Sequence, residues 1–159
     1  MKALIIYDSF YGNTEQIAQA IGKAIGSPWE VQVMRVSNVQ PQQWTGLNLL
    51  VVGSPTRGFR PTPAINKLLG GIPANGLQGV KVAGFDTRIS WDDIKPALLR
   101  SMAKIFGFAA KPISDKLMRK GGVLAAPPAG FFVKGSEGPL REGELERAAA
   151  WAKQIVATQ

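Results

Sequence analysis

Short apolar stretches, typical of buried β-strands, recur along this chain and are bounded by Gly, Ser or Pro. They lie at Ala3–Tyr7, around Val31 and Val33, and at Leu49–Val52, Val80–Phe85 and Val123–Ala126. Val31 and Val33 alternate with polar residues, whereas Leu49–Val52 is a continuous apolar run. The pattern predicts five strands.

Between these stretches, apolar residues recur at helical spacing. In Thr14–Ile25, the residues Ile17, Ala18, Ile21 and Ile25 share one helix face. Further helices are predicted near Pro63–Leu69, Trp91–Phe106 and Pro112–Lys120, and from about Glu142 to Val156.

Alternating strands and helices predict an α/β fold. We expect a doubly wound, five-stranded parallel sheet of order 2-1-3-4-5 with helices on both faces, because right-handed crossovers leave few other arrangements. Ligands of such sheets bind beyond the carboxyl ends of the strands. A site is therefore expected in the loops after Tyr7, Val52 and Phe85.

Length and composition narrow the class of protein. The 159 residues fit a single domain, residues 1–159. No stretch reaches the roughly 18 apolar residues of a membrane span, and the amino terminus lacks the pattern of a secretory signal, so a cytoplasmic protein is expected. The absence of Cys and His excludes thiol chemistry, zinc fingers and Ser-His-Asp triads. We expect no metal site, and any redox chemistry needs a bound cofactor.

The charge is unevenly distributed. The net charge is +8, and residues 95–120 hold seven basic side chains against Asp115 alone. Two interpretations stay open: a solvated face, or a surface that attracts an anionic partner such as nucleic acid, lipid, an acidic protein or a phosphorylated ligand.

The loop after the first strand leads directly into a helix, whose free N–H groups and dipole attract anions. Ser9 and Thr14 offer hydroxyl groups there, and Gly12 lets the backbone close around oxygen atoms. The loop therefore suits a phosphate group. The alternative is that Thr14 or Asn13 merely caps the helix.

Other patterns associated with phosphate are absent. The chain contains neither G-x-x-x-x-G-K-[ST] nor G-x-G-x-x-G. A receiver domain shares the strand order but needs a carboxylate at the end of the third strand, where this chain has Gly53-Ser54-Pro55.

Three segments of the chain resemble the flavodoxin family: Ser9–Thr14, Gly53–Gly58 and the closing Gly138-Pro139-Leu140. The resemblance extends over nearly the whole chain. It implies a flavodoxin-like domain that binds FMN non-covalently and cycles it between oxidised, semiquinone and hydroquinone states. The resemblance implies three groups of binding residues. The phosphate would be held by Ser9, Phe10, Tyr11, Gly12, Asn13 and Thr14. The ribityl chain and the flavin ring would be bordered by Ser54, Pro55, Thr56, Arg57, Gly58 and Phe59, and the other side of the flavin site would be closed by Asp86, Thr87 and Arg88.

The chain also departs from that family. Tyr11 stands where many members have Ser or Thr, and Phe85–Trp91 replaces a Gly-rich acidic loop with a ring-stacking Tyr. Phe59 and Trp91 are the candidate neighbours of the flavin ring. Each is equally well explained as a packing aromatic.

Two hypotheses concern how the loops that border the flavin ring would change the redox properties of the flavin. Arg57, Arg60 and Arg88 lie in or beside these loops, and a guanidinium near the reduced ring would raise its potential; we expect one of the three to matter. Gly58 would let its peptide turn when the flavin gains a proton. The alternative for Gly58 is a plain tight turn.

The stretch Trp91–Gly122 is the most individual part of the chain. Ser90 is expected to cap the predicted helix Trp91–Phe106. An apolar stripe along this helix consists of Ile94, Leu98, Leu99, Met102, Ile105 and Phe106. Core packing is the first explanation of the stripe. The alternative is that the stripe and its flanking cations dock an acidic redox partner or weakly contact an anionic membrane surface.

These observations favour an electron carrier that acts with redox partner proteins through basic region 95–120, with no catalytic residue assigned. The alternative is a small FMN-dependent NAD(P)H:quinone oxidoreductase-like enzyme, because Ser54–Arg57 also resembles the corresponding loop of such reductases. Whether the chain is an enzyme stays open. A third class, an interaction module on a redox-silent scaffold, is suggested only by the charge. No nucleic-acid motif is visible, so no nucleic acid is expected.

Overall fold

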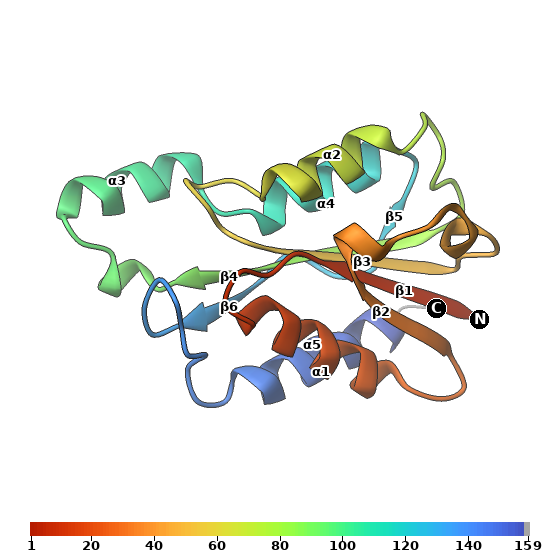
Figure 1. Ribbon diagram of the computed structural model, residues 1–159, viewed down its shortest axis with the longest axis horizontal. Helices are drawn as coiled ribbons and strands as arrows, with labels where there is room; N and C mark the ends of the chain where they lie inside the picture. The colour runs from red at the N-terminus through yellow and green to blue at the C-terminus, as the bar shows by residue number, and fades with distance from the viewer. Residues whose placement is uncertain (158–159) are drawn as a thin grey trace.

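Strands and helices alternate along the chain as predicted (Figure 1). The computed structural model describes residues 1–157, apart from the side chain of Phe106. The strands are β1 (Lys2–Tyr7), β2 (Glu30–Arg35), β3 (Leu49–Pro55), β4 (Lys81–Ile89), β5 (Val123–Leu124) and β6 (Ala129–Val133). The α-helices are α1 (Asn13–Ile25), α2 (Pro63–Gly71), α3 (Ala97–Phe106), α4 (Ala110–Arg119) and α5 (Glu144–Ala157). Short 3-10 helices cover Val36–Asn38, Pro41–Trp44 and Trp91–Asp93.

The predicted sheet order is confirmed: the parallel strands lie in the order β2-β1-β3-β4-β5. The sixth strand is an addition, because β6 continues along β4 where β5 stops, with Ala129 opposite Phe85. Pro127 and Pro128 lie between the two segments, and proline has no N–H for a strand ladder. The predicted strand Val123–Ala126 is therefore too long, and β6 was missed.

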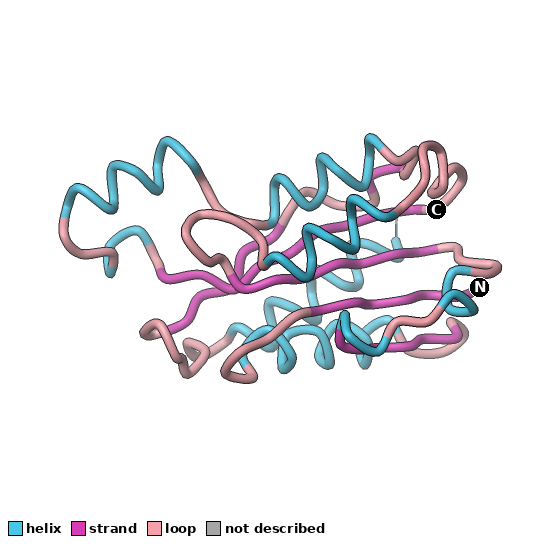
Figure 2. Tube along the Cα trace, turned by 45° about the horizontal axis from the view of Figure 1, so that its top comes forward, coloured by secondary structure: helices cyan, strands magenta, loops and turns pink. Residues whose placement is uncertain are grey.

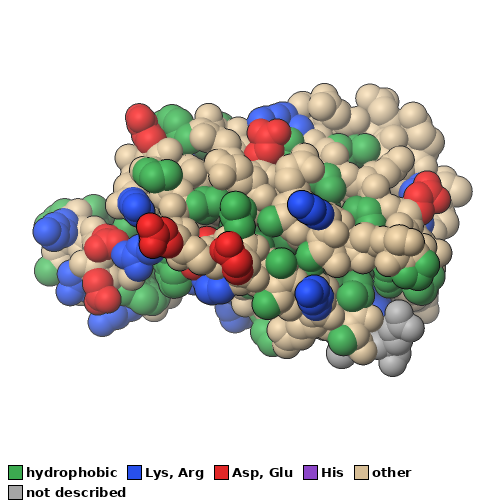
Figure 3. Space-filling view, turned by 90° about the horizontal axis from the view of Figure 1, so that it is seen from below, with side chains coloured by type: hydrophobic (Ala, Val, Ile, Leu, Met, Phe, Trp, Pro, Cys, Tyr) green, Lys and Arg blue, Asp and Glu red, His purple; other side chains and the backbone are tan. Residues whose placement is uncertain are grey.

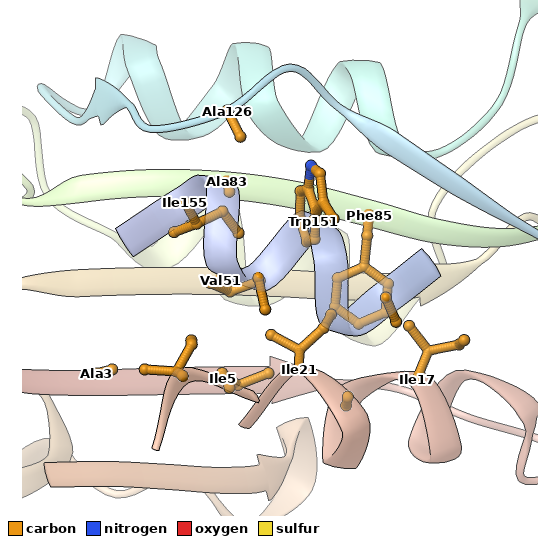
Figure 4. Close-up of a cluster of buried hydrophobic side chains, with 14 of the residues drawn as sticks. Ala3, Ile5, Ile17, Ile21, Val51, Ala83, Phe85, Ala126, Trp151 and Ile155 are labelled. Carbon is orange, nitrogen blue, oxygen red and sulfur yellow. The ribbon is translucent and has the colours of Figure 1, made fainter. Parts of the chain in front are cut away.

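Helices cover both faces of the sheet, with α1 and α5 on one side and α2 and α4 on the other (Figures 1 and 2). On the α1 side, Phe85, Phe131 and Trp151 meet edge to face, with ring centroids 6.1 to 6.2 Å apart. Figure 4 shows Phe85 and Trp151 among the aliphatic side chains of α1 and the central strands. Burying a side chain of this size stabilises the fold by roughly 1.5–3 kcal/mol.

The connection between β4 and α4 differs from the prediction. Instead of one helix over Trp91–Phe106, a 3-10 turn ends at Asp93 and α3 begins only after Pro96. A residue that precedes proline is pushed away from helical angles, which explains the interruption at Lys95. The expected capping by Ser90 is also wrong, because its side chain makes no capping hydrogen bond.

The other helix ends shift less. The predicted helix Pro112–Lys120 runs from Ala110 to Arg119. Pro112 stands in its first turn, where a missing N–H costs no hydrogen bond.

Core packing does not explain the apolar stripe of α3. Leu98 and Ile105 are 70% and 77% exposed, and Leu99 is 40% exposed. The side chain of Phe106, also predicted in this stripe, lies outside the described residues. Within residues 1–157, no helix is both long enough and apolar enough to cross a membrane.

Candidate functional site

The three loops predicted to carry the site meet beyond the carboxyl ends of β1, β3 and β4, where Figure 2 shows loops gathered at one end of the sheet. They enclose a cavity of about 310 Å³. Its lining residues are Ser9, Phe10, Tyr11, Asn13, Thr14, Pro55, Thr56, Arg57, Gly58, Thr87, Arg88, Ile89, Val133 and Ser136. Most of the predicted binding residues therefore surround one space.

A larger depression, of about 790 Å³, lies between the 3-10 helices that follow β2 and helix α2. Its walls are mainly apolar, and Lys67 is the only charged residue among those lining it. Because binding sites usually bring several polar groups together, the smaller cavity is the better candidate.

One end of the cavity is formed by the start of α1. Gly12 is the N-cap residue and no side chain caps the helix, so the alternative explanation, that Thr14 or Asn13 acts as the cap, is wrong. The N–H groups of a first helical turn have no partner within the helix. Together with the helix dipole, they provide an anion site.

Buried hydroxyl groups surround this helix start. The Thr14 and Thr87 hydroxyls share a hydrogen bond of 2.8 Å, which joins α1 to β4. The Ser9 hydroxyl accepts a hydrogen bond from the Gly12 N–H at 3.1 Å. Ser9 and both threonines are buried, so a ligand here would meet preformed polar groups rather than mobile side chains.

Two contacts that the sequence patterns did not predict hold this end together. The Asn13 amide donates to the Glu137 carbonyl at 3.1 Å, across 124 positions in the sequence. The Arg35 guanidinium donates to the Ser9 carbonyl at 2.7 Å. The loop before α5 and the end of β2 therefore both brace the anion site. No local sequence signal links these residues.

The loop after β3 is a tight hairpin. Arg57 and Arg60 exchange two backbone hydrogen bonds, of 2.8 and 3.1 Å. The two central residues, Gly58 and Phe59, have φ angles of 54° and 67°, as a two-residue type I′ turn requires. Glycine adopts this conformation at no steric cost, whereas a bulky residue such as Phe59 rarely does.

Ser54 stabilises the loop after β3. Its hydroxyl is fully buried, accepts a hydrogen bond from the Thr62 N–H at 3.0 Å and donates to the Pro55 carbonyl at 2.8 Å. This residue thus fixes the start of the hairpin to the start of α2.

An ion pair stands at the end of β4. Fully buried Asp86 accepts two hydrogen bonds of 2.6 Å from Arg88 and a third, of 2.8 Å, from the Ala110 N–H. This bidentate geometry is typical of an ionised carboxylate. Burial raises the pKa of Asp86, against the opposing effects of Arg88 and Ala110.

The Arg88 guanidinium is also enclosed by its neighbours. It lies 4.1 Å from the centre of the Phe108 ring and against Gly130, where a Cβ atom would come within 2.2 Å of it. Glycine at position 130 makes this close approach feasible. Arg88 is therefore neutralised and held in place, and its field at the cavity is reduced.

Arg57 has a different environment. Its guanidinium lies 5.0 Å from the centre of the Phe10 ring, and among the described residues no carboxylate lies within 4 Å of it. Of the three arginines named from the sequence, Arg57 thus lines the cavity with an unneutralised charge, whereas Arg60 lines a neighbouring depression.

The comparisons with known proteins agree with this fold. A family model described as Flavodoxin matches residues 5–151. The chain belongs to the flavodoxin family. Flavodoxins are electron-transport flavoproteins that bind a flavin, generally FMN, and act with redox partner proteins. No curated protein matches the sequence.

Several solved structures share the fold at low sequence identity. A flavodoxin from the domain Archaea is 23% identical, with a TM-score of 0.78 and coverage of 99% of this chain and 97% of the other. Oxidised Flavodoxin 1 from Bacillus cereus is 18% identical, with a TM-score of 0.79 and coverage of 100% and 99%. Rubredoxin oxygen:oxidoreductase from Desulfovibrio gigas is 21% identical, with a TM-score of 0.72, and matches 98% of this chain over 35% of its own length.

The predicted site residues fall into two groups. Those that line the cavity come from all three loops, whereas Gly12, Ser54, Phe59 and Asp86 lie behind or beside it. Neither candidate ring neighbour lines the cavity, since Phe59 borders the next depression and Trp91 packs against Phe108 with ring centroids 4.8 Å apart. Ser136, Val133 and Ile89 line the cavity without having been predicted.

Proposed function

We propose that this chain binds one FMN in the cavity between the three loops and carries electrons one at a time between partner proteins. The observation that supports this most directly is the uncapped start of α1, which faces the cavity beside the hydroxyls of Thr14 and Thr87. Such a site suits a doubly charged phosphate without a lysine, because backbone N–H groups supply the positive field.

The residues present fit the group that the family implies. Ser9 to Thr14 would hold the phosphate, and Pro55 to Gly58 with Thr87 and Arg88 would border the ribityl chain and ring. FMN, when bound, supplies the electron-accepting chemistry over its three oxidation states. Arg57 would contribute an uncompensated positive charge at the ring side, which favours the negatively charged reduced state.

We retain the carrier over the alternative, a small FMN-dependent NAD(P)H:quinone oxidoreductase-like enzyme, because no observation on the described residues favours a separate hydride-donor site. The proposal places the protein in the cytoplasm, in agreement with a chain free of Cys. Its partners would be redox proteins attracted by the basic region 95–120, which holds seven of the 19 Lys and Arg residues.

The first test is the visible spectrum of the purified protein, followed by stepwise anaerobic reduction. The expected result is the two absorption bands of oxidised flavin, with FMN released on denaturation and a stable one-electron-reduced form. Steady oxidation of NAD(P)H by the pure protein would indicate the enzyme instead. A colourless protein that also fails to bind added FMN would contradict the proposal as a whole.

A further inference from the structure

Helix α3 projects beyond the carboxyl ends of the strands, on the same side of the sheet as α2 and α4 (Figure 1). Leu98, Met102 and Ile105 are spaced four and three residues apart and so share one face of this helix. The two outer members, Leu98 and Ile105, are 70% and 77% exposed. A helix of a folded domain normally buries its apolar face, so this exposed face marks a contact surface.

The charges around α3 have one sign. No acidic residue occurs between Asp93 and Asp115. Lys95 precedes α3, and Lys104 stands next to Ile105 on one side of the apolar face. Arg100 lies on the opposite face of the helix and donates to the Asp92 carbonyl. Asp92 and Asp93 lie before α3 in the 3-10 turn, and Asp93 pairs with Arg141. Figure 3, which views the molecule from below, shows Lys and Arg side chains at the outer end of the protrusion with acidic side chains beside them.

This charge pattern argues against a second copy of the chain as the occupant. Two α3 helices packed through their apolar faces would bring Lys95 and Lys104 of both copies to the contact, without a carboxylate on either helix. Like charges at such a contact are destabilising. A complementary occupant must carry acidic groups.

An anionic membrane surface matches α3 less well than an acidic protein does. The helix is only about 15 Å long, and its exposed face is aliphatic, without a described Trp or Tyr to anchor at the interface. The exposed Asp92 and Asp93 would also meet the negative surface of the membrane. A protein can instead present its acidic groups in a patch beside an apolar groove, away from these two residues.

The segment that follows α3 contacts the two cavity loops that come after β3 and β4. Phe108, which follows α3, packs on Trp91 and on Arg88. The Ala109 N–H donates to the Thr56 hydroxyl at 3.0 Å. A protein seated on α3 therefore lies beside the cavity, where an electron carrier must be approached.

We propose that α3 is the docking helix for an acidic redox-partner protein. The exposed faces of Leu98 and Ile105 enter an apolar groove of that partner, and Lys95 and Lys104 pair with carboxylates at its rim. That the partner exchanges electrons with this protein rests on the proposed carrier function. That an acidic protein binds to α3 does not.

The test places a benzophenone-bearing amino acid at Ser101, which is exposed on α3, and cross-links the full-length protein in its own cells. The control carries the same group at exposed Gln19 on α1, on the opposite side of the sheet. The captured partner is then purified, and its electron exchange with the FMN-loaded protein is followed by stopped-flow absorbance. The variant Leu98→Ser with Ile105→Ser is compared with Leu145→Ser, a substitution of another exposed leucine on α5.

The expected result is a cross-link from position 101, and not from position 19, to a protein of net negative charge. The second-order rate should fall about tenfold in the α3 double variant and stay unchanged in Leu145→Ser. Lys95→Glu with Lys104→Glu should slow the reaction most at low salt, whereas Lys153→Glu on α5 should not.

Other outcomes would overturn the inference. One is a cross-link to a second copy or to a basic protein. Another is an electron-transfer rate that is equal in the α3 double variant and the wild type. A third is α3-dependent sedimentation with phosphatidylglycerol vesicles without any protein cross-link. A protein that binds no FMN but still cross-links to an acidic protein through position 101 would refute the carrier function and leave the docking helix supported.

Discussion

The two sides of the cavity are built differently. At the α1 side, buried polar groups close on one another: Thr14 bonds Thr87, Asn13 bonds the Glu137 carbonyl, and the surrounding side chains belong to the core shared with α5. At the α3 side, the large aliphatic side chains of Leu98 and Ile105 are exposed to solvent. A ligand that must stay bound needs the rigid side, whereas a partner that must come and go needs an exposed surface.

Between these two sides stands the Asp86–Arg88 pair, which gives the largest expected effect. Asp86→Asn should lower the free energy of unfolding by about 3 kcal/mol, because it leaves the enclosed guanidinium without its counter-ion. Urea unfolding monitored by circular dichroism measures this. In the control, Asp115→Asn, an exposed pair with Lys111 is lost, and the change should stay below about 1 kcal/mol. Equal effects of the two substitutions would contradict the structural role of Asp86.

On the rigid side, Thr14→Val removes one hydroxyl while keeping the shape of the side chain. We expect FMN to bind about tenfold more weakly, because Thr87 loses its partner and the phosphate loses a donor. Fluorescence titration of the apoprotein with FMN measures the dissociation constant. Thr45→Val, at an exposed threonine away from the cavity, should leave it unchanged. An unaltered affinity in Thr14→Val would remove this hydroxyl from the site.

At the hairpin between the two sides, Gly58→Ala tests the turning-peptide hypothesis. Added Cβ atoms meet open space at Gly58 and at Gly46, and both glycines have positive φ, so the two alanine variants carry similar strain, about 1 kcal/mol each. Only the change at Gly58 should lower the yield of one-electron-reduced flavin during anaerobic titration. An equal yield in both variants would favour the plain tight turn.

Arg57→Gln should make the reduction potential of the bound flavin more negative by a modest amount. The effect is limited because Arg57 is exposed and water screens its charge. Potentiometric titration measures both couples, with Arg119→Gln on α4 as the control for an exposed cation that does not line the cavity. If neither couple moves, Arg57 does not tune the flavin.

The smallest stability effect is expected on the docking side. Leu98→Ala should change the free energy of unfolding by less than about 0.5 kcal/mol, since the side chain is mostly exposed. Ile21→Ala, at a fully buried residue of α1, should cost about 2–5 kcal/mol. A large loss in Leu98→Ala would mean that α3 packs on the body and is not a free contact surface.

The individual elements show which parts of the fold a pattern can predict. The runs at β1, β3 and β4 and the helical spacing of α1 are local signals, and they led to the correct sheet order. Prolines also explain the break before α3, at Pro96, and the split of the edge strand, at Pro127 and Pro128. The prediction followed the apolar residues around these prolines and therefore missed both interruptions. The stripe on α3 was read as core because periodicity reports that a helix is amphipathic and says nothing of what covers its apolar face.

By itself, the sequence determined the order of strands, the placement of three loops at one end of the sheet and the resemblance to flavodoxins. These follow from the periodicity of apolar residues and from short motifs, which depend on neighbours in the chain. Only the tertiary structure decided that Glu137 braces Asn13, that Asp86 neutralises Arg88 while Arg57 keeps its charge, and that α3 faces solvent. Glu137 and Asn13 are far apart in sequence, and the exposure of α3 depends on what surrounds it, so no local pattern encodes either. Asp86 and Arg88 are two residues apart and share a face of β4, but the burial that encloses their pair comes from Phe108, Ala110 and Gly130.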